Sequence, residues 1–160
     1  MTDEMNKAPE GVVLPTLDDR AVIEDLLRAH AMAVAQRLAE ANHKNVPLSE
    51  VVQADQRAAA FIAGTLLGKN PSYQPAQVNT PAAIEKNLRA VLADHLKLYE
   101  IKDEEIQDPT VFMQAAMFIF TNKIHELINE LKANPDSIQE EGPVKLNALI
   151  SDWTNRILGK

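Results

Sequence analysis

Apolar residues recur at helical spacing along most of this chain, and no segment sustains the alternation of apolar and polar residues that is typical of a strand. The clearest stripe contains Ile23, Leu27, His30, Val34 and Leu38, which follow one another at steps of three or four residues. Most of the nine prolines stand between such stripes, where a helix starts or stops. The sequence therefore predicts an all-α fold, a helical bundle of about five helices.

Capping and stop signals predict the helix boundaries. We expect helices from a capping box at Thr16 and Asp19 to about residue 42, from Ser49 to a stop signal at 68–71, from Thr80 through 99, from Asp108 to about 132, and from Gly142 and Pro143 through 157. Residues 1–15 contain prolines and a glycine and show no periodicity. We expect residues 1–15 to form a flexible N-terminal tail and residues 16–160 to form a single α-helical domain.

One short pattern occurs twice. Ile23-Glu24 followed by Leu27-Arg28-Ala29 returns 61 residues later as Ile84-Glu85 followed by Leu88-Arg89-Ala90. The repeat is consistent with a duplicated antiparallel helical hairpin plus a C-terminal helix. Coincidence among common helix residues explains it equally well, and both interpretations stay open.

Charge and composition exclude several classes of partner and location. The net charge is −7 and the lysines and arginines are scattered singly, so we do not expect nucleic acid as a partner. The longest apolar run, 111–120, is interrupted by Gln114 and is too short to cross a bilayer, so we expect no membrane insertion. The chain begins with acidic residues and shows no apolar signal core. We therefore expect a cytoplasmic protein.

Three polar residues stand on apolar helix faces. His30 and His95 lie within their stripes, and Asp55 lies among apolar neighbours on the second expected helix. One interpretation is a site that binds a small ligand or a metal through His30, Asp55 and His95. The other interpretation, which we favour, is an ion pair between Arg37 and Asp55 together with two hydrogen-bonded core histidines, because an unpaired buried carboxylate is very costly.

Motifs for catalysis or for a bound cofactor are not evident. A di-iron bundle needs two Glu-x-x-His pairs, and the one spacing of this kind, Glu40 to His43, falls at a helix end. The glycine-containing segment 64–70 lacks the spacing and the serine or threonine of a phosphate loop. The absence of cysteine excludes thiolate chemistry and thiolate metal sites. We expect neither enzymatic activity nor a metal or cofactor.

The fourth expected helix carries apolar residues on all sides, which is typical of a central, buried helix. Alternatively, one flank of it, around Val111 and Phe118, meets a partner, with Trp153 of the last helix completing the surface. The leading hypothesis is a non-enzymatic protein-interaction module, an adaptor, chaperone-like protein or regulatory subunit that binds another protein or itself. The alternative is a small-ligand or metal-binding helical sensor that uses polar residues in the bundle core.

Overall fold

The computed structural model describes residues 11, 13–98, 100, 102 and 106–160, and these residues form a helical bundle without a β-strand. The elements are α1 (Arg20–Lys44), α2 (Leu48–Leu66), α3 (Pro81–Leu98), α4 (Pro109–Ala133), the short 3₁₀ helix η3 (Pro135–Ser137) and α5 (Ile138–Leu158). The predicted all-α bundle of five helices is confirmed. Among the described residues, no helix combines the length and the hydrophobicity needed to span a bilayer.

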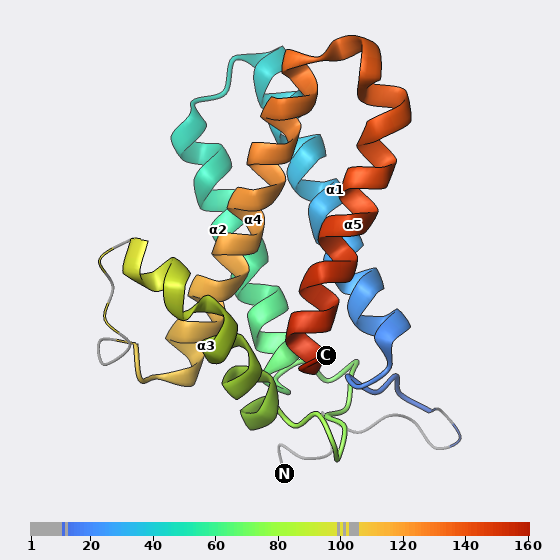
Figure 1. Ribbon diagram of the computed structural model, residues 1–160, viewed down its shortest axis with the longest axis vertical. Helices are drawn as coiled ribbons and strands as arrows, with labels where there is room; N and C mark the ends of the chain where they lie inside the picture. Colours follow the sequence, from blue (N-terminus) through green and yellow to red (C-terminus); the bar gives the residue numbers. More distant parts are fainter. Residues whose placement is uncertain (1–10, 12, 99, 101, 103–105) are drawn as a thin grey trace.

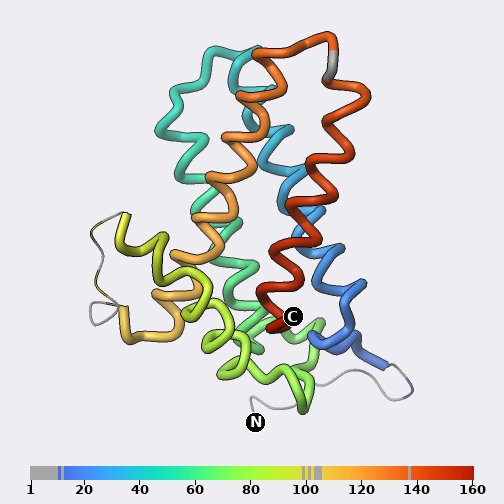
Figure 2. The backbone as a smooth tube through the Cα atoms, viewed as in Figure 1, coloured from blue at the N-terminus to red at the C-terminus, as the bar shows by residue number. Residues whose placement is uncertain are grey.

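Four of the helices form an antiparallel bundle (Figure 1). Along the chain α1 rises, α2 descends, α4 rises and α5 descends, and each packs against the next, with α5 closing the ring on α1. α3 crosses one end of the bundle, where it packs mainly on α5 and also on α4 (Figure 2). It thus takes the place of a simple loop between α2 and α4.

α4 contributes more buried residues than any other described helix, in keeping with its all-round apolar sequence. Phe112, Met113, Met117 and Phe120 on this helix are fully buried. The ring of Trp153 on α5 meets Phe120 edge to face, with centroids 5.3 Å apart and ring planes at 63°. Aromatic pairs favour this geometry because the positive ring edge meets the negative ring face.

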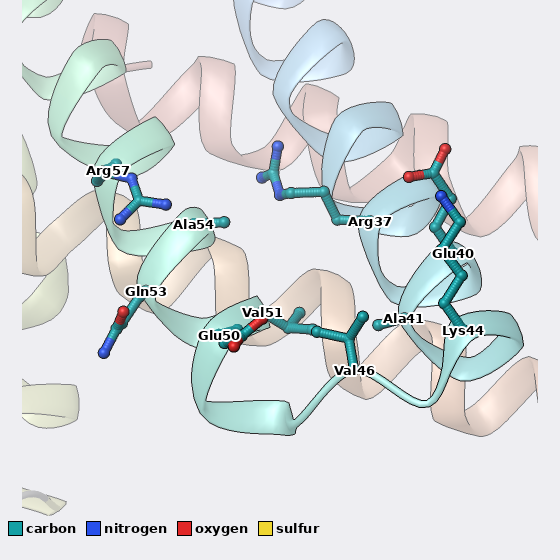
Figure 3. A pocket seen from close by; sticks show the side chains of 10 residues that line it. All are labelled: Arg37, Glu40, Ala41, Lys44, Val46, Glu50, Val51, Gln53, Ala54 and Arg57. Carbon is teal, nitrogen blue, oxygen red and sulfur yellow. The ribbon is translucent and has the colours of Figure 1, made fainter.

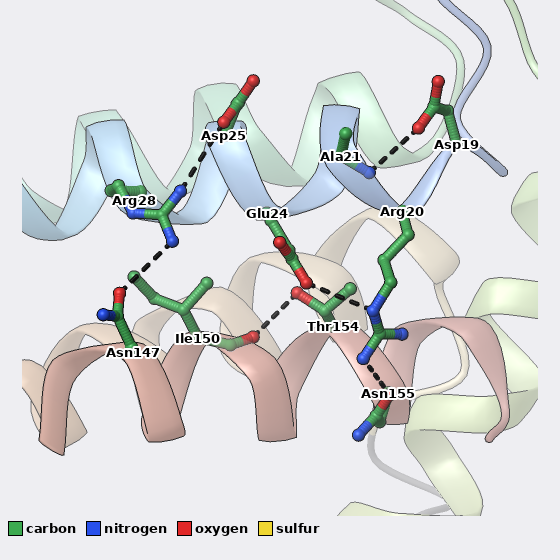
Figure 4. Close-up of polar contacts among 10 residues, drawn as sticks. All are labelled: Asp19, Arg20, Ala21, Glu24, Asp25, Arg28, Asn147, Ile150, Thr154 and Asn155. Carbon is green, nitrogen blue, oxygen red and sulfur yellow. Dashed lines mark hydrogen bonds and ion pairs between the residues drawn. The ribbon is translucent and has the colours of Figure 1, made fainter. Parts of the chain in front are cut away.

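Polar side chains join α1 to α5 along one edge of the bundle (Figure 4). Arg28 donates an Nη2–H to Asn147 Oδ1 at 3.3 Å, and Arg20 donates an Nη2–H to Asn155 Oδ1. Arg20 also pairs with Glu24 on its own helix. These partly exposed contacts align the two helices but add little stability, since exposed ion pairs are each worth about 0–1 kcal/mol.

The helix starts match the sequence in part. Asp108 and Thr80 cap their helices ahead of a proline, as predicted: Asp108 Oδ1 accepts from Thr110 N at 2.8 Å. Asp19 caps α1 alone, accepting from Ala21 N at 2.9 Å, so the expected capping box with Thr16 is wrong. Pro47, rather than Ser49, is the N-cap of α2.

The start of α5 also differs from the prediction. The helix begins at Ile138, directly after the 3₁₀ turn, and it contains Pro143 instead of starting there. Proline lacks the N–H that would bond the carbonyl four residues earlier. Gln139, which carries that carbonyl, is exposed, so water can satisfy it and the helix continues.

Residues 14–17 are held by the loop between α2 and α3. Gln74 N donates to Pro15 O at 3.1 Å, and Leu17 N donates to Gln74 O at 3.2 Å, with Leu17 fully buried. Of the expected flexible tail 1–15, residues 1–10 and 12 lie outside the described residues. Leu14 and Pro15, at the end of that expected tail, each accept a hydrogen bond from Gln74.

The two halves of the chain do not form equivalent hairpins. α1 is a full member of the bundle, whereas α3 lies across its end and has α5, not α4, as its main neighbour. The position that aligns with the buried His30 under the 61-residue offset is Val91, which is 38% exposed. The structure therefore gives the proposed duplication no support beyond the first turns of these helices.

Candidate functional site

A buried carboxylate joins three helices of the bundle. Asp55 on α2 is only 1% exposed, and its two oxygens have different partners. Arg37 on α1 donates its Nε–H to Oδ1 at 2.8 Å, and His125 Nε2 on α4 lies 2.7 Å from Oδ2. The predicted ion pair between Arg37 and Asp55 is confirmed, and His125 is an additional partner.

Asp55 is ionised at neutral pH. Burial by itself raises the pKa of this carboxyl group, but the hydrogen bonds from His125 and Arg37, together with the Arg37 charge, hold the pKa below its ordinary value of 3.8. Because an ionised carboxylate only accepts hydrogen bonds, His125 must donate its Nε2–H to Asp55. Each partner therefore supplies one hydrogen bond to the charge that the fold has buried.

A second chain of hydrogen bonds lies beside the first. His30 Nε2 is 2.8 Å from Thr121 Oγ1, and the Thr121 hydroxyl donates to Met117 O at 2.9 Å. Since the hydroxyl proton is used in that bond, His30 must donate its Nε2–H to Thr121. Burial, and after it the positive charge of Arg37, lowers the pKa of His30 from 6.5 to about 4, against the opposing charge of Asp55. His30 is therefore neutral at pH 7.

We call these five residues, His30, Arg37, Asp55, Thr121 and His125, the polar layer. The Thr121 hydroxyl and both Asp55 oxygens are engaged by protein groups, so neither side chain is free to act as a nucleophile or a base, whereas Nη2 of Arg37 is buried without a hydrogen-bond partner. Across the residues that the structure describes, no three histidine, aspartate or glutamate side chains are grouped so that they could hold a metal ion.

The polar layer contains two of the three residues proposed from sequence as a ligand site. His30 and Asp55 lie in it, but His95 is on α3, half-buried at the end of the bundle and without a hydrogen bond to another described residue. The expectation of a buried, hydrogen-bonded His95 is therefore wrong. His125 was not predicted from the sequence, although it stands four residues after Thr121 and seven after Phe118, on the same helix face.

A groove runs between α2 and α4 above the polar layer. It consists of two hollows of about 360 and 350 Å³ that share the side chain of Phe118. We call the whole surface the α2–α4 groove. Its lining residues are Leu38, Leu48, Val52, Asp55, Gln56, Ala59, Val111, Gln114, Ala115, Phe118, Thr121, Asn122, His125 and Asn129.

Two of the three residues predicted to meet a partner line this groove. Val111 is 49% exposed and Phe118 is half-buried, so both are accessible from solvent. Trp153 is 3% exposed and packs on Phe120 inside the same chain, so we remove it from the partner surface. Leu48, which is 65% exposed at the other end of the groove, was not expected from the sequence.

Comparison with known proteins identifies no relative of this chain: no family model, no curated protein and no solved structure matches it.

Proposed function

We propose that this chain is a non-enzymatic protein-interaction module whose α2–α4 groove binds a helix of another protein. One observation carries the proposal: among the residues that line the groove, His125 is the one basic side chain and the one carboxylate is buried. Asp55 is that carboxylate; Arg37 forms an ion pair with it, and His125 donates a hydrogen bond to it. No lysine, arginine or glutamate lines the groove.

This surface differs from the rest of the molecule. Charged residues make up 24% of the chain, so a surface of this extent with the buried Asp55 as its one aspartate, glutamate, lysine or arginine is unusual for it. The centres of protein interfaces are depleted in charged residues and enriched in aromatic and aliphatic ones. The groove has this composition, because Leu48, Val111 and Phe118 alternate along it with glutamine and asparagine.

The shape of the groove favours a helical partner. Its walls are two antiparallel helices, and Val111 and Asn129 stand about five turns apart on α4, or about 27 Å at 1.5 Å per residue. A helix laid along such a groove contacts it through apolar residues at positions i, i+3, i+4 and i+7. No strand edge occurs among the described elements, so strand addition has no template on them.

Other features of the chain fit a protein partner. A net charge of −7 disfavours nucleic acid. The Thr121 hydroxyl and the Asp55 carboxylate are already hydrogen-bonded to protein groups, in keeping with a binding role. The cytoplasmic location expected from the sequence belongs to the same proposal, and cell fractionation would test it.

A small-molecule ligand is the second candidate for this groove. The hollow beside Leu48 reaches down to Asp55, Thr121 and His125, and polar groups beneath apolar walls are typical of ligand pockets. Those three groups already satisfy one another or their neighbours, which leaves a ligand few free donors or acceptors. The charge-insertion variants described next separate a protein partner from a small ligand, because a protein partner needs the whole groove.

Matched charge insertions test the proposal. Val111→Glu and Leu48→Glu each place a carboxylate in the groove at a position exposed enough for the fold to tolerate it. Val144→Glu is the control, because Val144 on α5 is 66% exposed and lies outside the groove. Each variant is used to select from a displayed library of helical segments of the native proteome, and light scattering measures self-association.

We expect wild type and Val144→Glu to select the same segments, with apolar residues at helical spacing. Both groove variants should weaken binding of those segments by about tenfold or more, which corresponds to 1.4 kcal/mol. Binding that survives both groove variants, or that Val144→Glu weakens equally, contradicts the proposal. Concentration-dependent dimerisation that both groove variants abolish would replace the foreign helix with a second copy of this chain.

A further inference from the structure

A separate hollow lies on the opposite flank of α2, between α1 and α2 near the turn that joins them (Figure 3). Its volume is about 530 Å³, and we call it the α1–α2 hollow. Unlike the groove, it is lined by charged side chains. These are Arg37, Lys44 and Arg57 with Glu40 and Glu50.

Arg37 has hydrogen-bonding capacity that the protein does not use. Its Nε–H bonds to Asp55, but its Nη2 is buried and has no hydrogen-bond partner. A buried donor without an acceptor costs about 1–3 kcal/mol. The Nη2 atom is closed to solvent, so a ligand in the α1–α2 hollow reaches it only if the guanidinium group turns toward the hollow, and the cost of the unpaired donor favours that turn.

Arg57 supplies a second cation to the same space. It is exposed on α2 and forms no ion pair with any described residue. Figure 3 shows the guanidinium groups of Arg37 and Arg57 on either side of Ala54, one reaching from α1 and the other from α2. Paired guanidinium groups bind carboxylate or phosphate oxygens well, because their planar N–H groups match the spacing of those oxygens.

The other walls of the hollow select among anions. Glu40 and Glu50 add two negative charges to the lining, and they repel a doubly charged phosphate more strongly than a singly charged carboxylate. Val46 and Val51 provide apolar surface for a carbon body. We infer that the α1–α2 hollow binds a small organic monocarboxylate, with its carboxylate between Arg37 and Arg57 and its apolar part against Val46 and Val51.

This site is independent of the proposed protein-interaction function. The carboxylate site lies between α1 and α2, whereas the partner groove lies between α2 and α4. A negative result for one of these two sites does not contradict the proposal for the other.

Nuclear magnetic resonance titration tests the inference, with benzoate as the probe and inorganic phosphate as the comparison anion at matched ionic strength. Benzoate should cause saturable shifts in the Ala54 amide and in the Nε–H signals of Arg37 and Arg57. Phosphate should bind more weakly. Arg57→Gln should weaken benzoate about tenfold, the loss expected for one charge-assisted hydrogen bond of about 1.4 kcal/mol.

Two further variants complete the test. Lys86→Gln removes the same charge from an exposed position on α3, outside the hollow, and should leave benzoate affinity unchanged. Arg37→Lys keeps a cation for Asp55 but removes the planar guanidinium group, so it should weaken benzoate while the protein stays folded. Shifts that do not saturate, equal weakening by Arg57→Gln and Lys86→Gln, or phosphate binding as tight as benzoate would each overturn the inference.

Discussion

His30 should make the protein sensitive to mild acid. Its ring is buried and neutral in the folded state, where its pKa is about 4 rather than 6.5. As the pH falls below 6.5, the unfolded chain binds a proton at this residue while the folded chain does not. Stability that is fully present above pH 6.5 is therefore lost progressively as the pH falls from 6.5 toward 4.

The size of this loss follows from the two pKa values. At pH 5 the unfolded state is almost fully protonated at His30 and the folded state is mostly neutral, which lowers the free energy of unfolding by about 2 kcal/mol relative to pH 7.5. The loss approaches about 3 kcal/mol once both states are protonated. Asp55, whose pKa is also lowered, adds to the acid sensitivity at lower pH.

Urea unfolding at pH 7.5 and at pH 5.0 measures the effect. His30→Gln removes the titrating ring, while the glutamine amide can still donate a hydrogen bond to Thr121 Oγ1. This variant should lose about 2 kcal/mol less than wild type between the two pH values. His43→Gln is the matched control, because His43 is an exposed histidine on the same helix, and it should behave as wild type does. An equal loss in His30→Gln and wild type would refute the reasoning.

Three other predictions concern the packing. Asp55→Leu should destabilise the fold by about 3 kcal/mol because it leaves Arg37 without its counter-charge, and adding Arg37→Leu should restore part of that loss. Urea unfolding measures both variants, and an absence of coupling between the two substitutions would contradict the ion pair. Trp153→Ala should lower the free energy of unfolding by about 3–5 kcal/mol in the same assay. The fluorescence of this single tryptophan should shift to longer wavelength when the wild-type protein unfolds, and a red-shifted emission in the folded state would contradict its burial. Pro143→Ala should raise the thermal midpoint, with a gain of about 1 kcal/mol or more, because alanine restores the hydrogen bond to the Gln139 carbonyl; an unchanged or lower midpoint would contradict this account.

Local signals in the sequence were sufficient to predict the ion pair between Arg37 and Asp55 in the polar layer. The turn between α1 and α2 centres near residues 46–47, and folding two helices back about that centre brings Arg37 opposite Asp55. The cost of burying an unpaired carboxylate then identifies the pair. Neither step needs any information from the remainder of the chain.

The third partner of Asp55 could not be predicted in the same way. His125 lies 70 residues further along, and it meets Asp55 only because α4 packs beside α2. The hairpin interpretation of the sequence placed α4 beside α3, whereas in the structure α4 packs mainly beside α2. The polar character of Thr121 and His125 on one face of α4 was visible in the sequence, but the helix opposite that face was not.

The wrong prediction for His95 has a local cause. After Leu88, the stripe on α3 can continue through Val91 and His95 or through Leu92 and Leu96, since both routes keep helical spacing. The structure takes the second route, and both leucines are buried. Burying two leucines removes more apolar surface from water than burying a valine and a histidine, and it avoids a buried imidazole.

The position of the polar layer explains why an ion pair is kept in an otherwise apolar bundle. Well-packed apolar residues of similar volume would serve stability at least as well as Asp55 and Arg37. A purely apolar contact, however, holds two helices in several registers with similar energy, whereas hydrogen bonds at both oxygens of Asp55 fix α2 against α1 and α4 at once. The exposed apolar side chains of the α2–α4 groove come from both helices, so any slip of α2 along α4 would move Leu48 away from Phe118. The buried charge thus fixes the geometry of the surface that we propose as a binding site.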